Sequence, residues 1–149
     1  KTHIQIQVGK NLMVMSDAME MDPYVSFEAA AEKAAKQLRR HKRKIRDHHE
    51  RMEMTPEEEI IKARDYVLAA APEQDDEPQD EVIGDDPLII AELTRGILTL
   101  SVSDAVMHME LSGGEPVLFR NAANNELNMV YKRSDGNVGW VDPSNEASA

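Results

Sequence analysis

The side chains of this sequence that could do acid–base or metal chemistry are five histidines and the carboxylates near them. His48 and His49 are adjacent, so on a helix they point to different sides, and no second ligand follows four residues later. His108 and Glu110 have the two-residue spacing of a site on a strand, but the sequence around them predicts a helix. No nucleophile motif and no phosphate-binding glycine loop is present in the sequence. We therefore predict no catalysis, metal site or cofactor, and we interpret the histidines as surface or packing residues.

A block of positive charge is the strongest chemical signal in the chain. Residues 36–51 contain eight Lys and Arg against two acids, in a protein whose formal net charge is −11. The charge is +4 for residues 1–52, −11 for residues 53–86 and −4 for residues 87–149. Cations gathered on one helical face gain affinity for a phosphate backbone by releasing counterions, although charge runs are more often solvated surfaces. Because no aromatic residue lies among these bases, the block predicts backbone and groove contacts rather than base stacking.

A hairpin and a helix are predicted to position this block. The alternation of apolar and polar residues over 2–8 predicts a half-buried strand, and residues 12–15 predict its partner after a turn. A helix is predicted from Tyr24 to Arg51, with Asp22 as N-cap and Pro23 at its first position. A hairpin and one helix are too little to fold well alone, so we expect further elements on the N-terminal side. The predicted core stripe of the helix is Phe27, Ala31, Ala34, Leu38 and Ile45, with most of the bases on the far side.

Residues 53–86 are predicted to link two domains. Thr55, Pro56 and Glu58 have the pattern of a capped helix start, which predicts a short amphipathic helix over about 56–71. Residues 72–86 have the composition of a disordered acidic tether. An alternative function for this tract is to fold back on the basic helix and compete with weakly bound RNA, since ~15 flexible residues span about 20 Å.

The remaining residues, 87–149, predict a small β-α-β-β-β domain. Residues 96–102 predict a strand, residues 101–114 a capped helix, and residues 117–142 three further strands separated by turns. The last strands carry apolar residues on both faces, and a single short helix covers only one face of such a sheet. We therefore expect a second copy of the chain to cover the other face, the alternative being ordinary exposed apolar surface. The expected class for the whole chain is α+β, with two small domains.

The composition also bears on location. No apolar run in the sequence approaches the ~20 residues that cross a bilayer, and the chain contains no cysteine. Both features suit a protein of the reducing cytoplasm. We expect no membrane partner and no small-molecule substrate.

Two stretches of the sequence resemble a known family. The run "FRNAANNELNMVYKRSDGNVGWVDP" from residue 119 to 143, preceded by "SVSDAVMHMELSG", is similar to the C-terminal domain of that family, the long-form ribosome hibernation promoting factors. The segment "DPYVSFEAAAEKAAKQLRRHKRKIRDHH" resembles the last helix of its N-terminal domain, and "HIQIQVGKNLMVM" resembles the last two strands. The family's N-terminal domain has the order β-α-β-β-β-α, so we expect this chain to lack the first strand, first helix and second strand.

The resemblance implies a function and a set of site residues. The N-terminal domain is implied to bind 16S ribosomal RNA in the decoding region of the small subunit, where it blocks the messenger and transfer RNA sites. The C-terminal domain is implied to form a homodimer that pairs inactive ribosomes, a stress response without enzymatic activity. The alternative function is an oligomerisation module whose basic helix is masked by its own acidic linker. The implied RNA-binding residues are Lys36, Arg39, Arg40, His41, Lys42, Arg43, Lys44 and Arg46. The candidate dimer residues are Phe119, Leu127, Met129, Tyr131 and Trp140.

Overall fold

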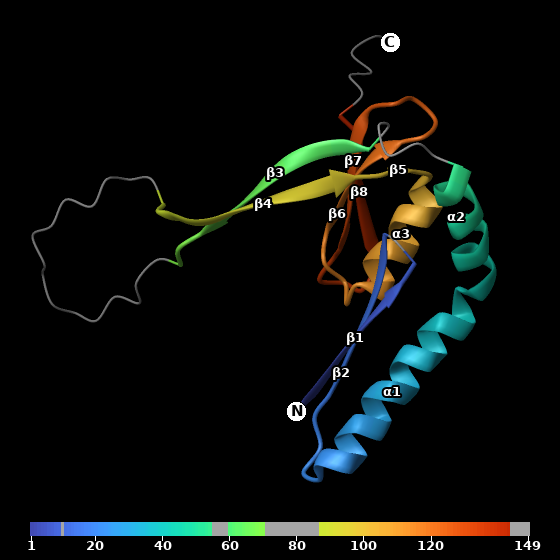
Figure 1. The fold of residues 1–149 in the computed structure, drawn as a ribbon, viewed down its shortest axis with the longest axis vertical. Coiled ribbons are helices and arrows are strands. Elements are labelled where there is room, and N and C mark those ends of the chain that lie inside the picture. The colour runs from blue at the N-terminus through green and yellow to red at the C-terminus, as the bar shows by residue number, and fades with distance from the viewer. Residues whose placement is uncertain (10, 55–59, 71–86, 144–149) are drawn as a thin grey trace, which may run out of the picture. The chain divides into compact units, whose positions relative to one another are not determined.

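The structure is a computed structural model that describes residues 1–9, 11–54, 60–70 and 87–143 (Figure 1). It confirms the α+β class: the chain contains helices, and its strands form three small sheets. The elements, in chain order, are β1 (Thr2–Val8), β2 (Leu12–Ala18), α1 (Pro23–Arg40), α2 (Lys42–Met54), β3 (Ile61–Leu68), β4 (Ile89–Ile97), β5 (Thr99–Leu100), α3 (Val102–Leu111), β6 (Val117–Asn121), β7 (Leu127–Lys132) and β8 (Val138–Val141).

The chain forms two compact units. One consists of residues 1–60 and 98–149, and the other is the segment 61–97. The expected domain boundary within residues 53–86 stays a prediction, because most of the expected tether, residues 72–86, lies outside the described residues.

The N-terminal hairpin and the start of α1 form as predicted, and β2 extends past the predicted residues 12–15 to Ala18. β1 and β2 pair antiparallel from Thr2↔Ala18 to Val8↔Leu12. The carboxylate of Asp22 caps α1 by accepting a hydrogen bond from the backbone N–H of Tyr24 at 2.7 Å. Such a bond satisfies one of the otherwise unpaired amides of the first helical turn. The cap, a local feature of the sequence, therefore fixes where the helix begins.

The core stripe of α1 differs from the prediction at the start of the helix. Phe27 is 57% exposed, whereas Ser26 and Ala30 are buried, so the expectation for Phe27 was wrong. The Ser26 hydroxyl donates to the Ala18 carbonyl at 3.0 Å, and the Ser16 hydroxyl donates to the Ala30 carbonyl at 2.8 Å. These bonds hold the helix close against β2, where only small side chains fit. Further along, Ala34 is buried, and Leu38 and Ile45 pack against the same core cluster.

The single long helix predicted over Tyr24–Arg51 is two helices that meet at His41. The hydrogen bonding continues through the junction, since His41 N–H donates to the Gln37 carbonyl at 3.1 Å and Ile45 N–H donates to that of His41 at 2.8 Å. No Pro or Gly marks this break in the sequence, although those residues mark most kinks. The break instead coincides with burial of the His41 side chain, which is a tertiary effect.

The short helix predicted over about 56–71 was wrong for residues 61–68, which form strand β3; residues 55–59 lie outside the described residues. β3 pairs antiparallel with β4, from Ile61↔Ile97 to Leu68↔Ile89, with a register shift between Val67 and Leu68. Ion pairs cross the two strands, Arg95 to Asp65 at 2.7 Å and Arg64 to Glu92 at 3.6 Å. The apolar spacing of a short segment fits either structure, and here pairing with a strand more than twenty residues away decided it.

The C-terminal sheet confirms the predicted helix and last three strands. Its order is β5-β6-β7-β8, with β5 parallel to β6 and the other pairs antiparallel. Ser101 caps α3 by accepting a hydrogen bond from the Asp104 N–H at 3.1 Å. One face of the sheet packs on α3 around a core of Leu100, Ala105, Met109, Phe119 and Val130.

Candidate RNA-binding and pairing surfaces

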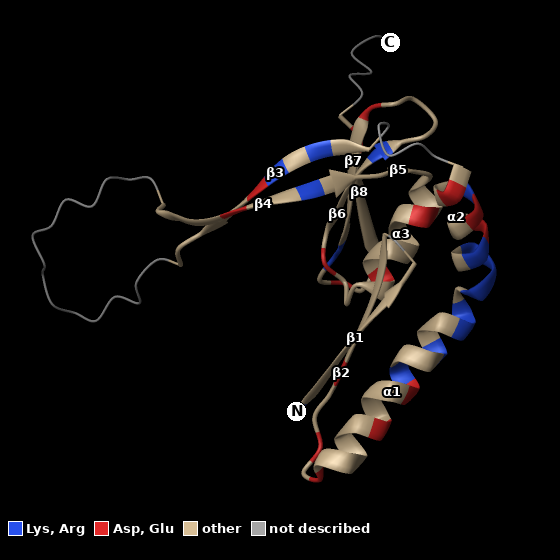
Figure 2. Cartoon of the chain, viewed as in Figure 1, with Lys and Arg blue, Asp and Glu red and all other residues tan. Residues whose placement is uncertain are grey.

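The basic residues of the block gather around the junction of α1 and α2 (Figure 2). Three of them have side-chain partners. Lys44 Nζ donates to Ser103 Oγ at 2.7 Å, Arg46 lies 3.6 Å from Asp47, and Arg51 donates to Asp104 at 2.8 Å. The others have neither an ion pair nor a hydrogen bond from their side chains to any described residue. Bases in the last turn of a helix are favoured by its macrodipole. The exposed members of the block are Lys36, Arg39, Arg40, Lys42, Arg43, Lys44, Arg46 and Arg51.

His41 lies apart from this exposed group. Its side chain is buried, and its Nε2 lies 2.9 Å from Glu110 Oε2 on α3, which makes an ion pair when the ring is protonated. The block that the sequence suggested therefore divides into exposed Lys and Arg side chains and one inward-facing histidine. His41 therefore lies against Glu110 of α3 and does not face solvent.

α2 and α3 are joined by a polar contact and a pair of rings. Arg51 donates to the Asp104 carboxylate at 2.8 Å, and that carboxylate is almost fully buried. The rings of His48 and His108 stack edge to face with centroids 4.7 Å apart. Burial lowers the pKa of His108 to about 4, with a further contribution from His48, and burial likewise lowers the pKa of His48. The two rings are therefore neutral packing groups near pH 7.

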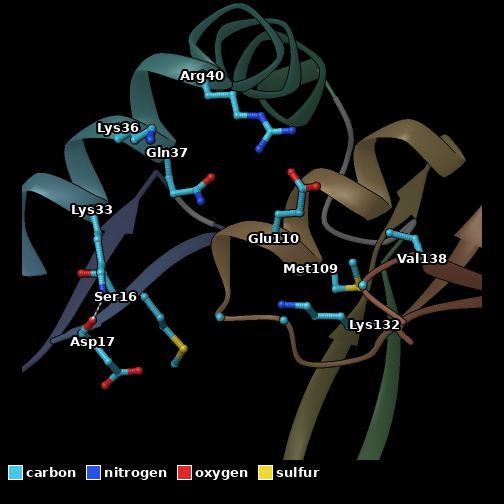
Figure 3. A pocket seen from close by; sticks show the side chains of 14 residues that line it. Ser16, Asp17, Lys33, Lys36, Gln37, Arg40, Met109, Glu110, Lys132 and Val138 are labelled. Atoms are coloured by element: carbon cyan, nitrogen blue, oxygen red, sulfur yellow. Dashed lines mark hydrogen bonds between the residues drawn. The ribbon is translucent and has the colours of Figure 1, made fainter. Parts of the chain in front are cut away.

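A cavity of about 700 Å³ lies between α1, β2, α3 and the end of the C-terminal sheet (Figure 3). Lys33, Gln37 and Arg40 extend from α1 into this region, and Lys132 points toward it from β7 (Figure 3). Sequence patterns could not indicate this cavity, because its wall combines residues about a hundred positions apart in the chain. Within the described residues, no group of three or more His, Cys, Asp or Glu is arranged to hold a metal ion.

The candidate dimer residues lie on both faces of the C-terminal sheet. Leu127, Met129 and Tyr131 alternate along β7 on the face opposite the α3-packed core, and Leu127 is 42% exposed. Phe119 is fully buried in that core, so it supports the sheet from inside. Trp140 is 51% exposed and pairs with the buried Val130, which places it on the α3 side at the edge strand β8.

An amide network that sequence reasoning missed crosses the sheet beside Trp140. Asn128 is 1% exposed, and its Oδ1 accepts hydrogen bonds from Asn121 Nδ2 at 3.0 Å and from Trp140 Nε1 at 2.9 Å. Its Nδ2 donates to Asp142 at 3.4 Å. The alternation of Asn128 with Leu127 and Met129 could have indicated a polar residue on the buried face. The bonds hold the indole in one orientation on an otherwise exposed edge.

Two family models match the chain. One, described as Sigma 54 modulation protein / S30EA ribosomal protein, covers residues 1–46, and the other, described as its C terminus, covers residues 84–139. The two matched segments together place the chain in the class of S30EA ribosomal proteins. Among the described residues, no helix is long and apolar enough to cross a membrane.

Curated relatives identify the family. The chain is 37% identical over 145 residues to a ribosome hibernation promotion factor of Bradyrhizobium diazoefficiens, covering 96% of this chain and 70% of that protein. It is 33% identical over 141 residues to the one of Rhizobium meliloti, covering 95% and 70%. A Bacillus subtilis protein of the same name is 27% identical over 137 residues, covering 90% and 68%. The chain belongs to the ribosome hibernation promotion factor family.

Proposed function

We propose that this chain binds the small ribosomal subunit through its basic helical surface and pairs inactive ribosomes through its C-terminal sheet. Membership of the family gives the chain a role in ribosome hibernation, and that family is not one of enzymes. The partner of the basic surface in this proposal is 16S ribosomal RNA at the messenger and transfer RNA sites. In this mechanism the bound chain excludes messenger and transfer RNA from their sites, so its affinity for the subunit and its position there determine how strongly it inhibits. A cytoplasmic location follows from this partner.

The observation that carries the RNA-binding proposal is the row of exposed cations around the junction of α1 and α2. Lys36, Arg39, Arg40, Lys42 and Arg43 are exposed and unpaired within the described part of the chain. Such groups are available to phosphate oxygens without first breaking an ion pair. They also concentrate positive charge on a protein of net charge −11, whose remaining surface repels a polyanion.

The pairing proposal rests on the face of the C-terminal sheet that α3 leaves uncovered. Leu118, Leu127 and Val141 are 42–50% exposed on three neighbouring strands, with Met129 and Tyr131 half-buried between them. We propose that the same face of a second copy covers these side chains, because a self-complementary patch generates a twofold dimer. Trp140 contributes from the sheet edge, and Phe119 acts only by supporting β6 from beneath.

Ribosome sedimentation across a salt titration tests the RNA-binding surface. The Arg40→Ala variant should bind more weakly, and the slope of log affinity against log salt should fall by about one. Lys62→Ala, which removes an exposed cation from β3, is the matched control and should bind like the wild type. An unchanged slope for Arg40→Ala would show that this side chain does not contact phosphate.

Sedimentation of the free protein tests the pairing surface. Leu127→Glu places a charge on the uncovered face and should convert a dimer to a monomer while leaving single-subunit binding intact. Glu126→Gln, one residue away in the exposed turn, should leave the dimer unchanged. A dimer that survives Leu127→Glu would move the pairing surface elsewhere, with the edge at Trp140 as the next place to test.

The alternative function is an oligomerisation module whose basic helix is masked by the acidic segment 72–86, which lies outside the described residues. Deleting that segment discriminates between the two. Masking predicts a large gain in ribosome affinity and in exposure of the basic helix to modification reagents. Our proposal predicts little change in either.

A further inference from the structure

The cavity between α1 and the C-terminal sheet has the composition of a site for an anion. Its wall includes four cationic side chains, Lys33, Lys36 and Arg40 from α1 and Lys132 from β7 (Figure 3). Its volume of about 700 Å³ is within the range of pockets that hold small molecules, about 300–1,000 Å³. Like charges that line one pocket repel one another, and a bound anion would reduce this repulsion.

The wall also contains two carboxylates. Asp17 accepts a hydrogen bond from His3 at 2.8 Å, which lowers the pKa of this carboxyl. Glu110 lies 2.9 Å from the His41 ring and forms an ion pair with it when the ring is protonated. Lys33 donates its own hydrogen bond to the Asp17 carbonyl at 2.8 Å. Four cations against two carboxylates leave the wall with a net positive formal charge.

The other three cations are uncompensated. Lys36, Arg40 and Lys132 have neither a hydrogen bond nor an ion pair to any described residue. The stem of Lys132 passes beside Gly114, whose φ of +89° favours glycine. Three unpaired cations on two sides of one cavity match a ligand with more than one negative charge.

The rest of the wall narrows the class of ligand. Gln37 Oε1 is buried and has no hydrogen-bond donor among the described residues, so it can accept from a hydroxyl or amino group. Met15 and Met109 add polarizable apolar surface to the same wall. A simple inorganic anion would use the cations but leave the amide oxygen and the thioethers without a partner.

We infer that this cavity binds a small molecule that carries two or more phosphate groups on a body with hydroxyl or amino donors. The phosphates would lie between Lys36, Arg40 and Lys132, and the donor would face Gln37. Lys132 separates this site from the proposed ribosomal surface, because it lies on β7, outside the basic block of α1 and α2. Since Lys36 and Arg40 belong to both, the bound molecule would compete with ribosomal RNA. The site itself does not depend on the proposed function.

Calorimetric titration of the full chain with pyrophosphate and with ADP at low salt tests the inference. Saturable binding of both is expected, with ADP tighter because it also reaches Gln37. Lys132→Met should weaken both about tenfold, a typical loss for one charge-assisted hydrogen bond. Lys62→Met removes the same charge from an exposed position on β3 and should change nothing. Lys132 is exposed, so circular dichroism should show an unchanged fold for that variant.

Three outcomes would overturn the site: no saturable binding at millimolar ligand, equal weakening by Lys132→Met and Lys62→Met, or pyrophosphate binding as tight as that of ADP. Ribosome sedimentation of Lys132→Met keeps this test separate from that of the proposed function. Wild-type ribosome binding together with weakened ADP binding supports a distinct small-molecule site. Weakened ribosome binding together with weakened ADP binding would overturn the claim that Lys132 separates this site from the ribosomal surface. A chain that binds ADP through Lys132 but binds no ribosome would refute only the proposed function.

Discussion

Acidification should destabilise this protein through the paired rings of His48 and His108. The His108 side chain is 9% exposed and its ring centroid lies 4.7 Å from that of His48. The described residues provide no hydrogen-bond partner for His108 Nε2 or for either nitrogen of His48. The one carboxylate that favours protonation, that of Asp104, is already bound by Arg51 at 2.8 Å. A proton on either ring would therefore be a buried charge beside a second imidazole.

The sign and size of the effect follow from the pKa of His108. Burial lowers that pKa from 6.5 to about 4 in the folded chain. Between these values the unfolded chain binds a proton that the folded chain does not, so the free energy of unfolding falls as the pH falls. From about pH 7 to about pH 5 the loss from His108 alone is about 2 kcal/mol. His48, whose pKa is also lowered, adds to the loss in the same direction.

Urea unfolding at several pH values measures this loss. The fluorescence of Trp140, the single tryptophan of the chain, reports on the sheet that packs on α3. Protein concentration must be held constant, because any self-association adds to the apparent stability. His108→Met preserves an apolar side chain of similar size but cannot titrate, so it should remove about 2 kcal/mol of the pH dependence. If His108→Met and the wild type lose the same stability on acidification, the reasoning is refuted.

The sheet beneath Trp140 gives two further predictions. Asn128→Ala leaves the donors of the buried Asn121 and of the half-exposed Trp140 without an acceptor, so unfolding should cost about 2 kcal/mol less and the tryptophan emission should shift. Unchanged emission would show that the amide does not hold the indole. Gly139→Ala would place a Cβ against the ring of Tyr131, and the melting temperature should fall by about 4 °C in calorimetry. Adding Tyr131→Ala should restore part of that loss, and no restoration would exclude a collision with the ring.

Much of the candidate site could be predicted from the sequence because it depends on neighbours in the chain. The Asp22 cap, the hairpin of β1 and β2 and the last strands follow from short-range patterns, and the structure confirms them. The sequence offered Ser101 or Ser103 as the cap of α3, and the structure selects Ser101. The exposed cations were likewise predictable, because eight bases within sixteen residues of a helix cannot all face a core. Local propensity and charge spacing were sufficient for these features.

Tertiary structure decided what depended on distant partners. Residues 61–68 became a strand because β4 offered a matching register, a choice that the spacing of apolar residues in 61–68 leaves open. His41 faces inward because Glu110, far along the chain, lies 2.9 Å from it. Lys132 joins Lys36 and Arg40 around one cavity only after β7 and α1 are brought together. The amino-acid sequence by itself thus determined the caps, the charges and the exposed face of the basic helix, because these interactions act within a few residues. The folded structure decided which of those side chains share a site, because that choice depends on packing and pairing between distant segments.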